Sequence, residues 1–195
     1  PTRQRLAPTT HAVAACTHLK ALTVDALDAA SLESGRFRAL ERLSGSFTRE
    51  FLRSVAGWCP LLSSVSVSHS HAFWDAFLGL AELPLLEFLE ISFCPLFGDV
   101  ACEALLSRCT GTLRELRLQH NEKMTPGILR TIATASCCRR LRLLKLAGLK
   151  GGVGEDGDYT CLAQLTRLHT LHLDGTLSVA SRSASVAMFP TLYDV

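Results

Sequence analysis

The sequence predicts an α/β solenoid, in which parallel strands line a curved concave face and helices or irregular segments form the convex face. An apolar triplet with fixed internal spacing recurs along the chain, and several segments between the triplets have helical periodicity. The triplets also recur within the range of about 20–50 residues that is typical of stacked repeat units, each of which buries its apolar face only against a neighbour.

The triplet consists of an apolar residue, two others, a second apolar residue, one other and a third apolar residue, as in "LRELRL" at 113–118. Its last two apolar positions alternate like a strand with one buried face. Copies start at Leu19, Leu62, Leu86, Leu113, Leu141 and Leu168, and a further start is expected at Leu192. From Leu62 to Leu168 the successive steps are 24, 27, 28 and 27 residues. We therefore expect residues 1–195 to form a single repeat domain.

Two of the segments between triplets are predicted to be helices. Thr125 supplies an N-cap before Pro126, a residue favoured in the first helical turn, and apolar residues then follow at helical spacing as far as Cys137. Asp99 is placed to cap an equivalent helix in the preceding repeat. Helices of this kind are bulkier than strands, so the outer side of the stack should spread.

Residues 28–58 leave two alternatives open. They contain a degenerate repeat at Leu40, Leu43 and Gly45, or an irregular insertion with a helix near residues 49–55. Glycine at a strand core position weakens the repeat interpretation, because it adds backbone entropy and no side chain to the core.

The spacing resembles that of the leucine-rich repeat family over nearly the whole chain from Cys16 onward. Cys16, Cys59 and Cys138 each stand three residues before a first leucine, and Cys109 stands four before Leu113. This register resembles the cysteine-containing subclass of the family, which is best known from substrate-recognition subunits of F-box ubiquitin ligases. The resemblance implies a horseshoe-shaped fold and a role in binding other proteins.

The composition excludes several classes of protein. Hydrophobic residues make up 48% of the chain and charged residues 19%, which is typical of a folded domain. Charges interrupt every apolar stretch before the ~18 residues that a membrane span requires. A formal net charge of +2 does not indicate a nucleic-acid binding surface.

The eight cysteines lie in apolar registers of a long hydrophobic chain, which favours a reducing, intracellular compartment over a disulfide-rich secreted domain. The compartment itself is left open between cytoplasm, nucleus and an organelle matrix. The chain begins at Pro1 and lacks the layout of a secretory signal, so we expect a fragment of a longer protein.

The sequence contains no complete motif for catalysis, metal binding or cofactor binding. The cysteines lack the spacing of a zinc knuckle, and His69-Ser70-His71 is expected to be polar loop surface. The segment "GGVGEDGD" at 151–158 lacks the lysine of a phosphate-binding loop and the acid spacing of a calcium loop, and is expected to be a connector. We predict no enzyme activity, no metal, no cofactor and no small-molecule substrate.

Residues between the buried positions of each triplet should point out of the concave face, where equivalent positions on neighbouring strands lie about 4.8 Å apart. Aromatic residues and arginine dominate interface energies, and both occur near the middle of this face. The predicted partner-binding residues are Phe88, Glu90, Phe93, Glu115, Arg117, Gln119, His120, Lys145, His172 and Asp174. The alternative is that Glu90 and Arg117 only pair with each other across adjacent strands, while Phe88 packs under a covering segment.

These observations predict a module that binds a protein partner on its concave face, as a scaffold or structural subunit of a larger assembly. One alternative, suggested by the cysteine register, is a substrate-recruiting adaptor of an F-box-type ubiquitin ligase. Another is an RNA-contacting subunit of a ribonucleoprotein, suggested by the basic stretch 137–145 together with Arg114 and Arg117.

Overall fold

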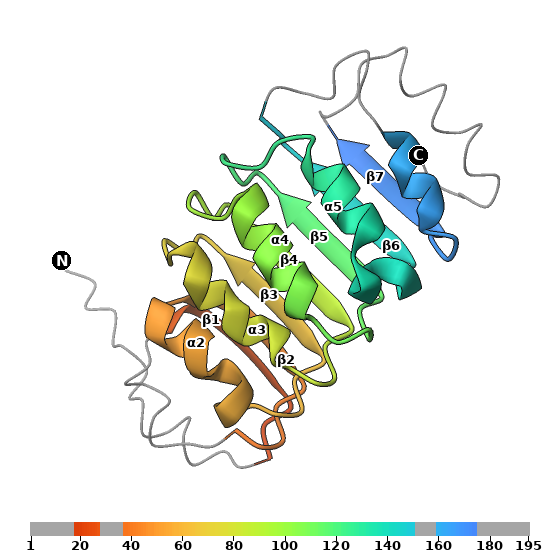
Figure 1. Ribbon diagram of the computed structural model, residues 1–195. Helices are drawn as coiled ribbons and strands as arrows, with labels where there is room; N and C mark the ends of the chain where they lie inside the picture. The colour runs from red at the N-terminus through yellow and green to blue at the C-terminus, as the bar shows by residue number, and fades with distance from the viewer. Residues whose placement is uncertain (1–17, 28–36, 151–158, 175–195) are drawn as a thin grey trace.

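A computed structural model describes residues 18–27, 37–150 and 159–174, and in these ranges the strands form one open sheet. All neighbouring strands are parallel, and their order in the sheet follows their order in the chain (Figure 1). The strands are β1 (Ala21–Leu27), β2 (Arg42–Phe47), β3 (Ser64–Ser68), β4 (Phe88–Ser92), β5 (Glu115–Gln119), β6 (Leu143–Ala147) and β7 (Thr170–Asp174).

Helices connect successive strands from β2 onward and cover one face of the sheet (Figure 1). The α-helices are α2 (Arg49–Trp58), α3 (Leu78–Ala81), α4 (Asp99–Arg108) and α5 (Ile128–Thr134). The 3-10 helices are η1 (Trp74–Phe77), η2 (Ser136–Arg140) and η3 (Tyr159–Gln164). The predicted α/β solenoid, with parallel strands on one face and helices on the other, is confirmed.

The apolar triplets form the core in the register that their spacing predicts. Leu89, Leu116 and Leu144 are directly paired on β4, β5 and β6, and all three are fully buried. The helices complete the core from the other side, for example with Leu105 of α4 and Ile132 of α5. Each repeat therefore buries its leucines against the next repeat, which is why neighbouring units are needed for stability.

The segment that the sequence left ambiguous contains both predicted features. β2 lies between β1 and β3, and α2 follows it with Thr48 as N-cap, whose hydroxyl accepts a hydrogen bond from the Phe51 amide at 3.4 Å. Gly45 has a φ of 149°, and a Cβ there would lie 2.0 Å from the Val24 carbonyl oxygen. Glycine is therefore required here by the close approach of β1. Residues 28–36 lie outside the described ranges.

Two sequence predictions about the helices are wrong in detail. Asp99 is the first residue of α4, whose N-cap is Gly98, and its carboxylate instead accepts hydrogen bonds from the amide and hydroxyl of Thr125 at 2.9 and 2.5 Å. α5 begins after Pro126 at Ile128 and ends before Cys137, which belongs to η2. The carboxylate of Asp99 thus ties the start of one helix to the turn before the next, a contact between repeats that local sequence does not show.

The cysteines are mostly core residues. Cys59, Cys94, Cys102, Cys137 and Cys138 are buried, whereas Cys109 and Cys161 are half-buried. The thiols of Cys137 and Cys138 lie 3.8 Å apart, and no group of three or more possible metal ligands occurs among the described residues. Cys16 lies outside the described ranges. Of the predicted register, Cys59 and Cys138 are core residues, whereas Cys109 is half-buried and packs against the core.

The buried cysteines should react slowly with a thiol reagent in the folded protein. Burial raises the pKa of Cys59 to about 12 and that of Cys94 to about 11, so the reactive thiolate is scarce at neutral pH in addition to being inaccessible. We expect both to be protected from a chromogenic disulfide reagent until denaturant is added, with sites assigned by mass spectrometry. Rapid labelling of Cys59 in the native state would contradict its place in the core.

Other sequence predictions fall partly on undescribed residues. The connector at 151–158 and the repeat start at Leu192 lie outside the described ranges. Among the helices that the structure does describe, none is long and apolar enough to cross a membrane.

Candidate functional site

The face of the sheet opposite the helices, here called the open face, carries the side chains that alternate with the buried triplet positions. Strand pairing places Glu90, Arg117, Lys145 and His172 in one row across β4 to β7. Phe88 and Glu115 lie in the adjacent row, and Gln119 lies in the row on the other side. The structure thus brings most of the predicted binding residues together on one surface.

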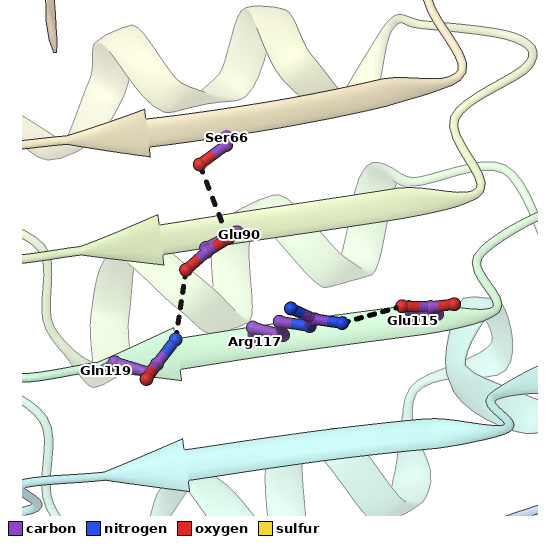
Figure 2. A network of polar contacts seen from close by, with 5 residues as sticks. All are labelled: Ser66, Glu90, Glu115, Arg117 and Gln119. Atoms are coloured by element: carbon purple, nitrogen blue, oxygen red, sulfur yellow. Dashed lines mark hydrogen bonds and ion pairs between the residues drawn. The ribbon is translucent and has the colours of Figure 1, made fainter. Parts of the chain in front are cut away.

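Glu90 links three strands of the open face. One of its carboxylate oxygens accepts a hydrogen bond from the Ser66 hydroxyl at 3.4 Å, and the other accepts one from the Gln119 amide at 3.0 Å (Figure 2). All three side chains are half-buried. These bonds orient the carboxylate along the sheet and keep Gln119 pointing toward β4.

Arg117 is held within its own strand and by the aromatic ring beside it. Its guanidinium forms an ion pair with Glu115 at 3.2 Å (Figure 2), and its central carbon lies 5.0 Å from the centroid of the Phe88 ring. The expected alternative of an ion pair between Glu90 and Arg117 is not what the structure shows, although the two residues are directly opposite. The buried Nε of Arg117 has no hydrogen-bond partner among the described residues.

The remaining predicted residues of the open face lie toward β7. In the strand register Lys145 lies opposite Arg117 of β5 and His172 of β7. Both Lys145 and His172 are half-buried. Asp174 ends β7 opposite Ala147, but its side chain lies outside the described part of the structure. The row therefore changes from acidic at Glu90 to basic at Arg117 and Lys145.

Phe93 and His120 are not part of this network. They follow the ends of β4 and β5 and form a column of stacked rings with His69, which follows β3 in the same way. The ring centroids of His69 and Phe93 are 4.9 Å apart, as are those of Phe93 and His120, with interplanar angles of 8° and 18°. All three are exposed. We call these three residues the aromatic column.

The aromatic column arises from an unusual backbone conformation repeated in three units. His69, Phe93 and His120 have φ values of 54°, 53° and 51°, in the left-handed region that non-glycine residues rarely adopt. Each amide donates to the carbonyl of the last residue of the next strand, at 3.1, 3.0 and 2.8 Å. Because the three backbones are alike and the strands are about 4.8 Å apart, the rings are brought to stacking distance. The next residue in the series is Gly148, with a φ of 66°.

The sequence did not single out the aromatic residues after β3. Phe73 and Trp74 are 59% and 46% exposed, and the guanidinium of Arg49 lies 5.8 Å from the Phe73 ring centroid. The sequence signal that could have identified them is the pair of adjacent aromatic residues two positions after His71. With the aromatic column they gather exposed rings at the carboxyl ends of the strands.

The basic side chains that suggested RNA are partly compensated. Arg114 forms an ion pair with Glu87 at 3.1 Å, as Arg117 does with Glu115. Two of the arginines that suggested RNA are thus neutralised by acidic neighbours.

No protein-family model and no curated protein match the sequence. Solved structures do match. A chain of the yeast Rad7 and Elc1 complex aligns with 76% of this chain at a TM-score of 0.63 and 20% identity. Leiomodin-1 actin-binding site 2 aligns with 73% at 0.58 and 17% identity, and an internalin from Listeria monocytogenes aligns with 91% at 0.54 and 13% identity. The chain has the leucine-rich-repeat fold.

This leucine-rich-repeat chain spans 38% of the matched chain of the Rad7 and Elc1 complex, 87% of the leiomodin-1 chain and 54% of the internalin chain. At these identities the likeness concerns the fold. Because one fold hosts many unrelated functions, this likeness does not assign a role to the chain.

Proposed function

We propose that the chain is a non-catalytic module that binds a protein partner on the open face, as a scaffold or structural subunit of a larger assembly. The observation that carries this proposal is the arrangement of Arg117 over the ring of Phe88, in the middle of a face that no described helix covers. The proposed contact surface consists of the predicted residues that share the open face, namely Phe88, Glu90, Glu115, Arg117, Gln119, Lys145 and His172.

Arginine and aromatic residues are enriched among the few residues that dominate binding energies. The ion pair with Glu115 and the ring of Phe88 restrict the guanidinium of Arg117 before any partner arrives, so less conformational entropy is lost on binding. Glu90, oriented by Ser66 and Gln119, offers a fixed acceptor on the neighbouring strand.

The proposal is tested by quantitative affinity purification of the tagged protein and of the variant Phe88→Ala/Arg117→Glu. We expect stoichiometric partners of the wild-type protein to be lost from this variant, because it removes the ring and reverses the charge at the centre of the open face. The matched control is Val100→Ala/Arg108→Glu on α4, where both side chains are exposed on the helical side. Equal retention of partners by both variants would contradict binding on the open face.

A second candidate is a substrate-recruiting adaptor of an F-box-type ubiquitin ligase. It is supported by the cysteine register, since Cys59 and Cys138 are buried three residues before the first leucine of their repeats. The same purification separates the two candidates. Ligase subunits among the partners that the open-face variant retains, together with a substrate that it loses, would favour the adaptor.

A further inference from the structure

The aromatic column ends at His69 on the side of β2. The residue of β2 at the equivalent position is Phe47, because Phe47 and His69 both stand two residues beyond the register pair Gly45 and Val67. The ring of Phe47 does not continue the column. It is buried and stacks on the Phe51 ring of α2 with centroids 5.0 Å apart. Among described residues, the ring that stacks on His69 is that of Phe93, on the other side.

A hollow of about 390 Å³ lies between the end of β2 and the segment that follows β3. It lies within the range of about 300–1,000 Å³ that is usual for sites binding small groups. Its lining includes His69 from the aromatic column and three apolar side chains, those of Phe47, Ala72 and Phe73. The hollow therefore adjoins the end of the column and has apolar walls.

The polar side chains around the hollow favour a negative charge at its rim. Arg49 and His71 line it together with His69, and no carboxylate is among its lining residues. Arg49 forms an ion pair with Asp75 at 2.8 Å, but Arg53 pairs with the same carboxylate at 3.0 Å. Two guanidinium groups thus share one carboxylate, which leaves a positive charge beside the hollow.

We propose that this hollow binds an aromatic side chain of a partner protein, stacked against His69 as the next ring of the column, with an acidic residue beside it that pairs with Arg49. The apolar walls suit the ring, and the guanidinium suits its acidic neighbour. An aromatic ring of this kind contributes a large contact area at low cost in conformational entropy.

A protein segment is favoured over a nucleic acid. Binding a phosphate backbone relies on many cationic contacts, whereas the chain has a formal net charge of +2 and the lining of the hollow includes one arginine. The proposal does not rest on binding at the open face, because the hollow is lined by residues 46–49, 69 and 71–73 and by none of the partner-binding residues proposed for the open face.

The test is a titration of isotope-labelled protein with blocked tripeptides, followed by NMR. The probes are Asp-Trp-Asp, Asp-Leu-Asp and Lys-Trp-Lys, each acetylated and amidated, and an oligothymidine. We expect saturable shifts of the amides of Ser46, Thr48 and His69 with Asp-Trp-Asp at millimolar concentration, and weaker binding of the other two peptides. Absence of saturable shifts with Asp-Trp-Asp, an equal response to Asp-Leu-Asp, or tighter binding of oligothymidine would overturn the proposal.

The matched variants are His69→Asn and His120→Asn. Asparagine tolerates the left-handed conformation of both positions, so each variant removes a ring from one end of the column with little backbone strain. We expect His69→Asn to weaken Asp-Trp-Asp binding by roughly 2- to 10-fold, as loss of a stacked aromatic pair implies, and His120→Asn to leave it unchanged. Equal weakening by both would overturn the proposal, provided that their melting temperatures match. Binding retained by Phe88→Ala/Arg117→Glu would show that the hollow acts separately from the open face.

Discussion

Leu116→Ala is expected to lower the free energy of unfolding by about 2–5 kcal/mol, because it removes a fully buried side chain from the centre of the stack. Leu116 is paired with Leu89 and Leu144 in neighbouring repeats, so the cavity would open between three units at once. The measurement is equilibrium unfolding in urea, with the slope checked for a change in cooperativity.

The control for this prediction is Leu85→Ala, a leucine that is 46% exposed just before β4. Its loss should change the free energy of unfolding by no more than about 0.5 kcal/mol, as is usual for surface positions. If Leu116→Ala and Leu85→Ala behaved alike, Leu116 would not be a core residue and the register of β5 would be wrong.

Asn121→Ala is expected to be destabilising because it leaves two backbone groups unsatisfied inside the protein. The side-chain oxygen of Asn121 accepts from the Cys94 amide at 2.9 Å, and its nitrogen donates to the Ile91 carbonyl at 2.9 Å. Asn121 itself is 1% exposed. Each backbone group that loses its partner should cost about 1–3 kcal/mol, measured by urea unfolding.

Asn121→Leu separates the lost hydrogen bonds from the lost volume, since a leucine stands at the equivalent place, Leu149, in the next repeat. It should remain clearly less stable than the wild-type protein. As a control, Ser107→Ala removes a hydroxyl bond to the Ala104 carbonyl on the exposed side of α4 and should have little effect. Wild-type stability of Asn121→Leu would mean that Asn121 does not hold the two strands together.

The side chain at the Asn121 position is not uniform between repeats, and the structure shows what replaces it. In the repeat of β3, the equivalent residue is Ser70, which is buried. Its hydroxyl donates to the Phe47 carbonyl at 2.8 Å and accepts from the Ala72 amide at 3.3 Å. Ser70 and Asn121 thus each bond a backbone carbonyl of the preceding strand. The two side chains therefore both satisfy backbone groups between repeats, although they differ in length.

The strands were predictable because their signal is local and periodic. Leu113, Leu116 and Leu118 have to face the core at fixed spacing, and the same requirement holds in every unit, so errors in one repeat are corrected by the others. The helices were less well predicted at their ends. The role of Asp99 depends on a contact with Thr125 in the next repeat, and no rule that treats one helix at a time contains it.

The set of open-face residues could be named from sequence because strand alternation determines which side chains leave the core. The side-chain contacts that these residues make with one another could not be predicted from sequence. Arg117 is opposite Glu90 but pairs with Glu115 and lies over Phe88, since long side chains on a crowded face choose among several acids and rings within reach. Such choices depend on side-chain rotamers and on the competing bonds of Ser66 and Gln119.

By itself, the sequence determined the repeat from Leu62 onward and the alternation of core and open-face positions along its strands, because apolar periodicity acts within a few residues and is reinforced at every repeat. The place of β2 in the sheet was decided by the tertiary structure. Only the tertiary structure decided that His69, Phe93 and His120 stack and that Phe47 turns into the core instead. Three non-glycine residues adopt a left-handed conformation because neighbouring strands accept their amide hydrogens, and that condition exists only once the repeats have assembled.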